Sequence, residues 1–244
     1  MQREFAAAAL PLRARLLHLL IESAQQLQLA PIVKYTALSL FAHRFYPRCL
    51  SRLEERANDV ANWLLYPLRE SNLQLFALVS LWISTKIHTS LHLSVKIFKS
   101  LGDSIIKEQH YTVRDYLEAE VVLMKEVNFE IGINNIAFAH FEELLLQFKG
   151  VAKVGELVNF EAGMDIMDLL YEKEETSMLY TNPRSLAASV LACLQNRILV
   201  LVNVANFGLL FSNFVSMLFC RLLHISSRYL NRCWNFLFFL GLSL

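Results

Sequence analysis

Turn-forming residues are scarce in this sequence. Its 244 residues include only seven glycines and five prolines. A sandwich or barrel of many short strands needs more turn formers than this, so the scarcity favours helices. Charged residues are also few, at 18%, whereas hydrophobic residues make up 55%. That balance excludes an intrinsically disordered chain, because it provides ample apolar surface for a core.

A strong net charge is also missing. The formal net charge is +1, which gives no reason to expect nucleic acid or another polyanion as a partner. The four cysteines form no C-x-x-C pair that would indicate a zinc or redox site. Glu4 and Pro11 interrupt the amino-terminal segment in a way that a secretory signal would not tolerate. We therefore expect the body of the chain to be a reduced, intracellular protein.

Acidic residues are absent from the end of the chain. All 22 precede residue 194, and only four of the 23 basic residues follow it. Residues 1–193 thus hold 19 basic and 22 acidic residues, a net charge of −3 that is ordinary for a soluble domain. Residues 194–244 form an apolar tail that needs a separate interpretation.

Apolar residues recur at steps of three and four through the body, which is the period of amphipathic helices. Thr112 with Asp115 predicts a capping box at the start of one helix. Asn182 before Pro183 predicts an N-cap followed by proline at the first helical position. We expect a charged connector helix or an ordered loop at 51–65, and a helix over 31–47 that ends at Pro47. The other expected helices cover 12–27, 73–88, 93–106, 112–128, 136–148, 160–171 and 183–194.

Two of these helices, 73–88 and 183–194, are apolar on most faces. Such a helix is typical of the buried centre of a domain. Each follows a pair of amphipathic helices, which predicts a duplicated helical unit whose second copy is incomplete. The expected fold class is all-α, and by periodicity alone the chain could be any helical interaction scaffold.

Motifs that carry catalysis are missing. The chain has no G-x-G-x-x-G, no G-x-x-x-x-G-K-[ST], no G-x-S-x-G and no H-E-x-x-H. His88 and His92 have i,i+4 spacing, but no third ligand is evident, so we interpret them as surface or capping histidines. The acidic runs at 142–143 and 172–175 are typical of a solvated face. We expect neither enzymatic activity nor a metal or cofactor.

Two charges lie on otherwise apolar helices. Lys86 ends the run L-W-I-S-T at 81–85, and Glu120 precedes V-V-L-M at 121–124. An unpaired buried charge costs several kcal/mol, so each of these groups must reach water or find a partner. Lys86 could extend to solvent near a helix C-terminus while Glu120 lies on an outer face. The alternative is that the two residues mark an interface.

Several motifs in the first half of the chain resemble those of cyclins. R-A-R-L at 13–16 resembles the M-R-A-I-L element in the first helix of a cyclin box. H-R-F at 43–45 stands where cyclins carry D-R-F, and S-T-K at 84–86 resembles the A-S-K ending of the buried third helix. A-E-V-V-L-M-K at 119–125, with F-E-I at 129–131, resembles the fifth helix and the segment after it.

The resemblance extends over roughly residues 10–193. Y-T-N-P-R-S-L-A-A-S at 180–189 resembles the start of the third helix of a second cyclin box. Within the cyclins, the stretches 31–41, 70–76 and 151–156 are most similar to the small plant J-type group. The resemblance implies a cyclin fold with one complete five-helix box at 1–133, an incomplete second box at 134–193 and the tail at 194–244.

The resemblance also implies a function. Cyclins are activating, regulatory subunits that bind a cyclin-dependent protein kinase in the control of cell division, so we expect this role in the nucleus, the cytoplasm or both. We expect neither nucleic acid nor a second copy of the chain as a partner. In cyclins the residues that match Lys86 and Glu120 pair with each other and contact the kinase near its activation helix. After Lys86, I-H-T at 87–89 replaces the F-E-E of many cyclins, so one acidic interface residue is missing.

Cyclins also dock substrates on an apolar patch of the first helix, which holds the leucine of an R-x-L motif. Here the matching patch would comprise Leu12, Arg15, Leu16, Leu19 and Glu22. Arg15 replaces an aliphatic residue, and Leu19 stands where many cyclins have tryptophan. Because such a patch needs apolar depth, we expect substrate docking to be weak or absent.

Two other functions stay open at this point. One is a cyclin-fold helical adaptor that activates no kinase, although the basic stripe that would favour it is missing. The other is a membrane-attached helical protein, because Ile198–Cys220 is uncharged and its 23 residues would span roughly 34 Å as a helix. Asn203, Asn206 and Asn213 make that segment polar for a lone spanning helix. The loss of helical pattern and acidic residues near Cys193 favours translated non-coding sequence, such as a retained intron, over a native apolar tail or a membrane segment.

Overall fold

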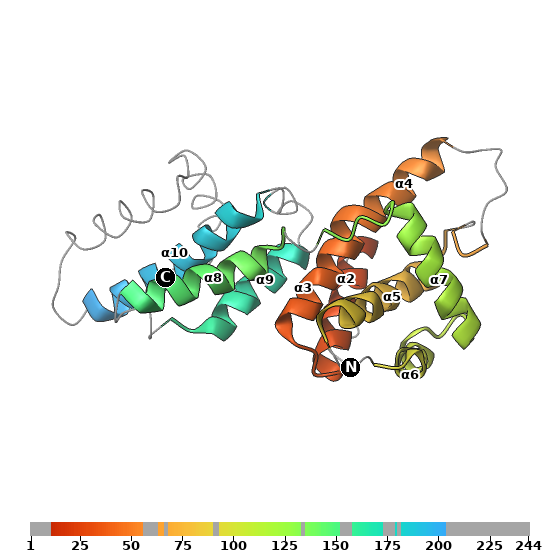
Figure 1. The fold of residues 1–244 in the computed structure, drawn as a ribbon, viewed down its shortest axis with the longest axis horizontal. Coiled ribbons are helices and arrows are strands. Elements are labelled where there is room, and N and C mark those ends of the chain that lie inside the picture. The colour runs from red at the N-terminus through yellow and green to blue at the C-terminus, as the bar shows by residue number, and fades with distance from the viewer. Residues whose placement is uncertain are drawn as a thin grey trace. The chain divides into compact units, whose positions relative to one another are not determined.

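The computed structural model describes residues 11–55, 63–65, 68–89, 93–132, 135–151, 158–172, 179 and 182–203. Within these ranges the regular structure is helical and contains no strand (Figure 1). The all-α fold class is therefore confirmed. The chain divides into two compact units, one of residues 1–134 with 171–174 and one of residues 135–170 with 175–244.

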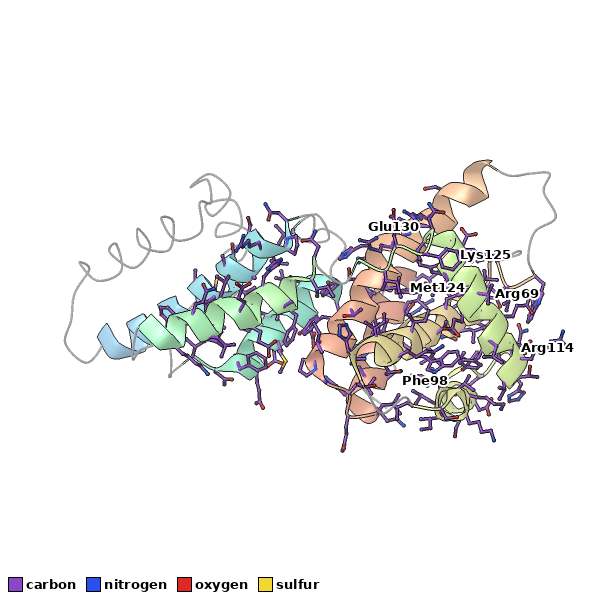
Figure 2. The ribbon with its side chains drawn as sticks, in the orientation of Figure 1. Arg69, Phe98, Arg114, Met124, Lys125 and Glu130 are labelled. Atoms are coloured by element: carbon purple, nitrogen blue, oxygen red, sulfur yellow. The ribbon has the colours of Figure 1, made fainter. Side chains whose placement is uncertain are left out.

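A single buried helix organises the first unit. The helix α5 (Glu70–His88) packs against α2 (Leu12–Gln26) and α3 (Pro31–Ser39) on one side and α7 (Val113–Glu126) on the other (Figure 1). Its residues 75–81 are fully buried, because a helix that is apolar on most faces can be covered all round. This is the central helix expected at 73–88. The helix α6 (Val95–Ile105) also contacts α5. The two ends of α7 are marked by Arg114 and Lys125 in Figure 2.

The helix that begins at Pro31 continues through Pro47, so our prediction of its end was wrong. The helix α3 passes into a π-helical turn, η1 (Leu40–Phe45), and then into α4 (Tyr46–Glu55). Proline has no N–H to donate to the preceding turn. Just before Pro47, the π turn shifts the backbone hydrogen bonds from the i−4 to the i−5 carbonyl, as in the bond from the Tyr46 N–H to the Phe41 carbonyl. Ser51 also lies within α4, and its hydroxyl donates to the Pro47 carbonyl at 3.0 Å.

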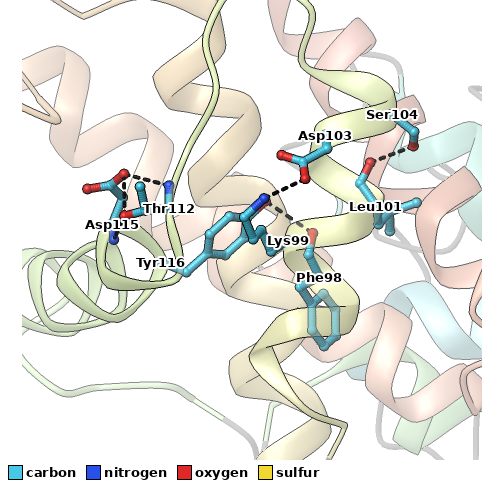
Figure 3. Close-up of polar contacts among 8 residues, drawn as sticks. All are labelled: Phe98, Lys99, Leu101, Asp103, Ser104, Thr112, Asp115 and Tyr116. Atoms are coloured by element: carbon cyan, nitrogen blue, oxygen red, sulfur yellow. Dashed lines mark hydrogen bonds and ion pairs between the residues drawn. The ribbon is translucent and has the colours of Figure 1, made fainter.

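Local signals and tight packing fix the junction between α6 and α7 (Figure 3). The predicted capping box is confirmed, because the Asp115 N–H donates to the Thr112 Oγ1 and the Thr112 N–H donates to the Asp115 carboxylate. One residue later, the buried Tyr116 hydroxyl donates to the Phe98 carbonyl on α6 at 3.1 Å. Burial raises the pKa of Tyr116, so this hydroxyl keeps its proton. A Cβ added at Gly102 would lie 2.0 Å from the same hydroxyl oxygen.

Gly102→Ala is therefore expected to lower the free energy of unfolding by about 1–3 kcal/mol. The added methyl group would push the Tyr116 hydroxyl away from the Phe98 carbonyl. Tyr116→Phe removes the obstructing oxygen, so the alanine should cost less in that background. Urea denaturation of the four variants measures both costs. An equal cost in both backgrounds would show that Tyr116 is not the obstacle.

The second unit contains α8 (Ala137–Val151), most of α9 (Phe160–Glu172) and α10 (Pro183–Asn203). Here α10 packs on α8, and α8 approaches α9 so closely that a Cβ on Gly163 would lie 2.4 Å from the Phe141 ring. The predicted N-cap is confirmed, because the Asn182 Oδ1 accepts from the Ser185 N–H at 3.2 Å.

The last described helix, α10, extends into the range that we assigned to the apolar tail. The helix α10 runs ten residues past residue 193, to Asn203, so the first part of 194–244 continues a helix of the second unit. Within the described ranges, no helix has both the length and the apolar character needed to span a bilayer. The candidate membrane segment at 198–220 lies mostly outside the described residues, as does the rest of the tail.

Candidate functional site

Lys86 and Glu120 meet although 34 residues separate them in the sequence. Lys86 lies in the last turn of α5 and Glu120 near the middle of α7, and these two helices pack against each other. The Lys86 ammonium donates to the Glu120 carboxylate. The side chains are 32% and 24% exposed, so the pair lies at the edge of the core. The two charges are thus partners at one place that a second molecule could reach.

Trp82 is a third residue of this site and was not predicted from the sequence. The Lys86 Nζ lies 3.6 Å from the centroid of the Trp82 ring, one turn earlier on α5. The indole N–H donates to the Leu93 carbonyl at 3.2 Å and so fixes the ring. A cation over the face of tryptophan is attracted by the ring quadrupole. The ammonium is therefore held between a carboxylate and an aromatic face, and only the i,i+4 spacing of Trp82 and Lys86 could have indicated this.

Apolar side chains surround Glu120 on the outer face of α7. Leu117 is 47% exposed, Val121 is 50% exposed, and Met124 is half-buried. These residues and Glu120 follow the i, i+3, i+4, i+7 spacing that places side chains on one face of a helix. A soluble domain would ordinarily carry polar residues there. Exposed apolar side chains around an oriented charge pair are typical of a protein interface.

The end of α7 adds an exposed aromatic ring. The Asn128 N–H donates to the Lys125 carbonyl at 3.0 Å and the Phe129 N–H to the Met124 carbonyl at 2.8 Å, the two bonds of a Schellman motif. The Phe129 side chain is 66% exposed. Met124 and Lys125 can be followed in Figure 2 along the last turns of α7. The chain thus leaves α7 with a large apolar side chain in solvent.

The residues proposed for substrate docking do not form one exposed surface. Leu16 is 1% exposed and belongs to the core. Leu12, Arg15 and Leu19 are half-buried, and Glu22 is exposed. Two of these five groups are already engaged, since Arg15 pairs with Glu70 at 2.6 Å and Glu22 with the His18 ring at 3.1 Å. Little apolar depth is left for an incoming leucine.

His43, at the position of the cyclin aspartate, is half-buried beside two cations. Its ring stacks on Tyr171 with centroids 5.3 Å apart, and Arg13 donates to the Tyr171 carbonyl at 3.3 Å. Burial, and then the charges of Arg13 and Arg44, lower the pKa of His43 from 6.5 to about 4. The imidazole is therefore neutral at physiological pH, where the matching carboxylate of a D-R-F motif would be charged.

The metal-like spacing of His88 and His92 brings no ligand set together in the described ranges. His88 is the last residue of α5, and its Nε2 lies 2.7 Å from the Thr36 hydroxyl on α3. Burial lowers the pKa of His88. His92 lies outside the described residues. Across the part of the chain that the structure describes, no group of three His, Cys, Asp or Glu residues could hold a metal ion.

Known proteins resemble this chain along most of its length. The family model of the cyclin N-terminal domain matches residues 3–132. Cyclin-J18 of Arabidopsis thaliana is 57% identical over 180 residues, which are 74% of this chain and 76% of that protein. Cyclin-J18-like of Oryza sativa subsp. japonica is 48% identical over 195 residues, which are 77% of this chain and 75% of that protein. These matches confirm the resemblance to plant J-type cyclins. With the helical structure they confirm the cyclin fold. The chain therefore belongs to the cyclin family, whose members are regulatory proteins of the cell cycle.

Proposed function

We propose that this chain binds and activates a cyclin-dependent protein kinase, in the nucleus, the cytoplasm or both. The observation that carries the proposal is the Lys86–Glu120 pair, held at the edge of the exposed apolar face of α7. We call Lys86, Glu120, Leu117, Val121 and Phe129 the docking surface. Family membership supports the kinase as the partner, because cyclins act through such kinases.

The geometry suits the capture of a mobile helix. Leu117, Val121 and Phe129 offer apolar contact area, and its removal from water is the main driving force of association. The ion pair adds orientation, since a partner must present matching charges when it desolvates the pair. Lys86 is already held by Glu120 and Trp82, so its side chain loses little entropy on binding. A kinase helix bound here would be held toward the kinase active site. This position completes the kinase's own Lys–Glu pair and its Mg²⁺ site, and it helps to order the kinase activation loop.

The direct test is reconstitution with purified kinase. The full chain is mixed with each cyclin-dependent kinase of its source plant, and with a kinase of another family as a control. We expect one or more cyclin-dependent kinases to bind and to phosphorylate a peptide substrate at least tenfold faster with the chain present. Binding without activation would favour the helical adaptor. If the chain binds none of the cyclin-dependent kinases, the proposal is overturned.

Substrate docking through α2 is expected to be weak. Leu16 lies in the core and Arg15 is held by Glu70, so an R-x-L peptide would find a shallow, partly charged surface. A fluorescent R-x-L peptide titrated against the full chain should bind no more tightly than the high micromolar range. The variant Arg15→Ile/Leu19→Trp, which restores apolar area, should bind more tightly. Sub-micromolar binding by the wild type that Leu19→Ala abolishes would contradict this expectation.

A further inference from the structure

Two arginines, one on η1 and one on α4, donate hydrogen bonds to backbone carbonyls at the end of α7. The Arg44 Nη1, from η1, donates to the Glu130 carbonyl at 2.9 Å. The Arg48 Nη1, from α4, donates to the Glu126 carbonyl at 3.0 Å. The same two guanidinium groups lie 3.9 and 3.8 Å from the Glu130 carboxylate. Glu130 lies just beyond the end of α7 in Figure 2, so the two side chains bracket the segment from Glu126 to Glu130.

The backbone inside this bracket is strained. Asn128 has φ +54° and Phe129 has φ +59°. Asparagine is common at this left-handed position after a helix, but a bulky residue rarely adopts it. Burial of the Phe129 ring does not offset the cost, because the side chain is 66% exposed. Such a conformation persists only where the surrounding structure imposes it.

Arg44 also contacts the backbone beyond Glu130, at Gly132. Gly132 has φ +71°, and a Cβ at this residue would lie 2.0 Å from the Arg44 Nη2 and 2.3 Å from its Cζ. The guanidinium group therefore packs directly on the Gly132 backbone. Arg44 and Arg48 are four residues apart and span the junction from the π turn to α4. The π turn before Pro47 thus sets the face from which both arginines reach the segment.

We propose that Arg44 and Arg48 are positioning residues of the docking surface. Their guanidinium groups hold the left-handed backbone at Asn128 and Phe129 and so keep the Phe129 ring in solvent, where the kinase can contact it. The inference rests on the proposed function, because it takes the docking surface as the kinase site. A glycine at 129 would satisfy the fold with less strain. The strained backbone at Phe129 is therefore explained by binding of the ring to the partner rather than by folding.

Preorganisation is the physical benefit. A ring that is already held in its bound position loses less conformational entropy when the partner arrives. Without the arginines, the Glu126–Gly132 segment relaxes and the ring samples many positions. Lysine cannot replace Arg44 here, because a point charge cannot donate to a carbonyl and also lie flat on Gly132.

The test uses the full chain and the kinase identified above. The variants are Arg44→Ala, Arg44→Lys, Arg48→Ala, Phe129→Gly and the double variant Arg44→Ala/Phe129→Gly, with Arg184→Ala, an exposed residue of α10, as the matched control. We expect each variant of Arg44 or Arg48, and Phe129→Gly, to weaken kinase binding at least tenfold, and the Arg184→Ala control to bind like the wild type. Phe129→Gly should at the same time raise the unfolding midpoint, because it relieves the strain.

Two further readouts separate positioning from general stability. The double variant should bind no more weakly than Phe129→Gly alone, because Arg44 acts through Phe129. Amide hydrogen exchange at Phe129 and Glu130 should speed up in Arg44→Ala without kinase present. Additive losses of affinity, unchanged exchange, or wild-type affinity of Arg44→Ala, Arg44→Lys, Arg48→Ala or Phe129→Gly would overturn the inference. If Lys86→Glu abolishes binding while the Arg44 and Arg48 variants bind normally, only this inference fails. If Lys86→Glu also binds normally, the docking surface itself is wrong.

Discussion

Lys86→Glu is expected to weaken kinase binding by one to three orders of magnitude, which corresponds to about 1.4–4 kcal/mol. The change places two carboxylates side by side at the edge of the core. Docking of the kinase would then desolvate a repulsive pair instead of an attractive one. Calorimetric titration of the full chain with the kinase measures the loss.

A charge swap distinguishes an interface role from a structural one. In Lys86→Glu/Glu120→Lys the two side chains can pair again, so the unfolding midpoint should return close to that of the wild type. Kinase affinity should stay low, because the polarity presented to the partner is reversed. The matched control is the same swap at Lys99 and Asp103, an ion pair on α6 outside the docking surface, which should change neither quantity. A Lys86/Glu120 swap that binds as tightly as the wild type would assign the pair to folding alone.

The helices could be predicted from the sequence because their causes are local. The apolar period, the capping box of Thr112 and the proline after Asn182 each act within a few residues. The passage through Pro47 could not be predicted in this way. The helix continues through Pro47 because the hydrogen-bond register changes in η1. The local rule used for the prediction considers only an ordinary α-helical turn, which proline ends.

The candidate site was predictable only in part. Lys86 and Glu120 stand out in sequence because each is a charge in an apolar run, and the family resemblance pairs them. Arg44 stands in the H-R-F motif, but no sequence signal indicates the partners of Arg44 or Arg48, because these are backbone carbonyls more than seventy residues away. Leu16 is the opposite case, a residue that the sequence assigned to the surface and the structure places in the core. Its place in the cyclin motif suggests an exposed patch, but the packing of α2 on α5 buries it.

His43 is expected to make the first unit less stable in mild acid. Its pKa is about 4 in the folded chain against 6.5 for a free imidazole. Between these two values the unfolded chain binds a proton that the folded chain does not, so the free energy of unfolding falls as the pH falls. The contribution is fully present above pH 6.5 and is lost progressively down to about pH 4. Its total size is about 3 kcal/mol, since a difference of one in pKa corresponds to about 1.4 kcal/mol.

Urea denaturation at several pH values between 7 and 4 measures this loss. His43→Asn has no proton to bind in this range, so it should lose about 3 kcal/mol less than the wild type. His43→Asp restores the cyclin D-R-F pattern and places a carboxylate between the Arg13 and Arg44 guanidinium groups. Those two charges favour the ionised carboxylate, so this variant should keep its stability down to about pH 4 and lose it only below. His110→Asn, at an exposed position, is the control and should follow the wild-type curve. Parallel curves for the wild type and His43→Asn would show that His43 does not cause the acid sensitivity.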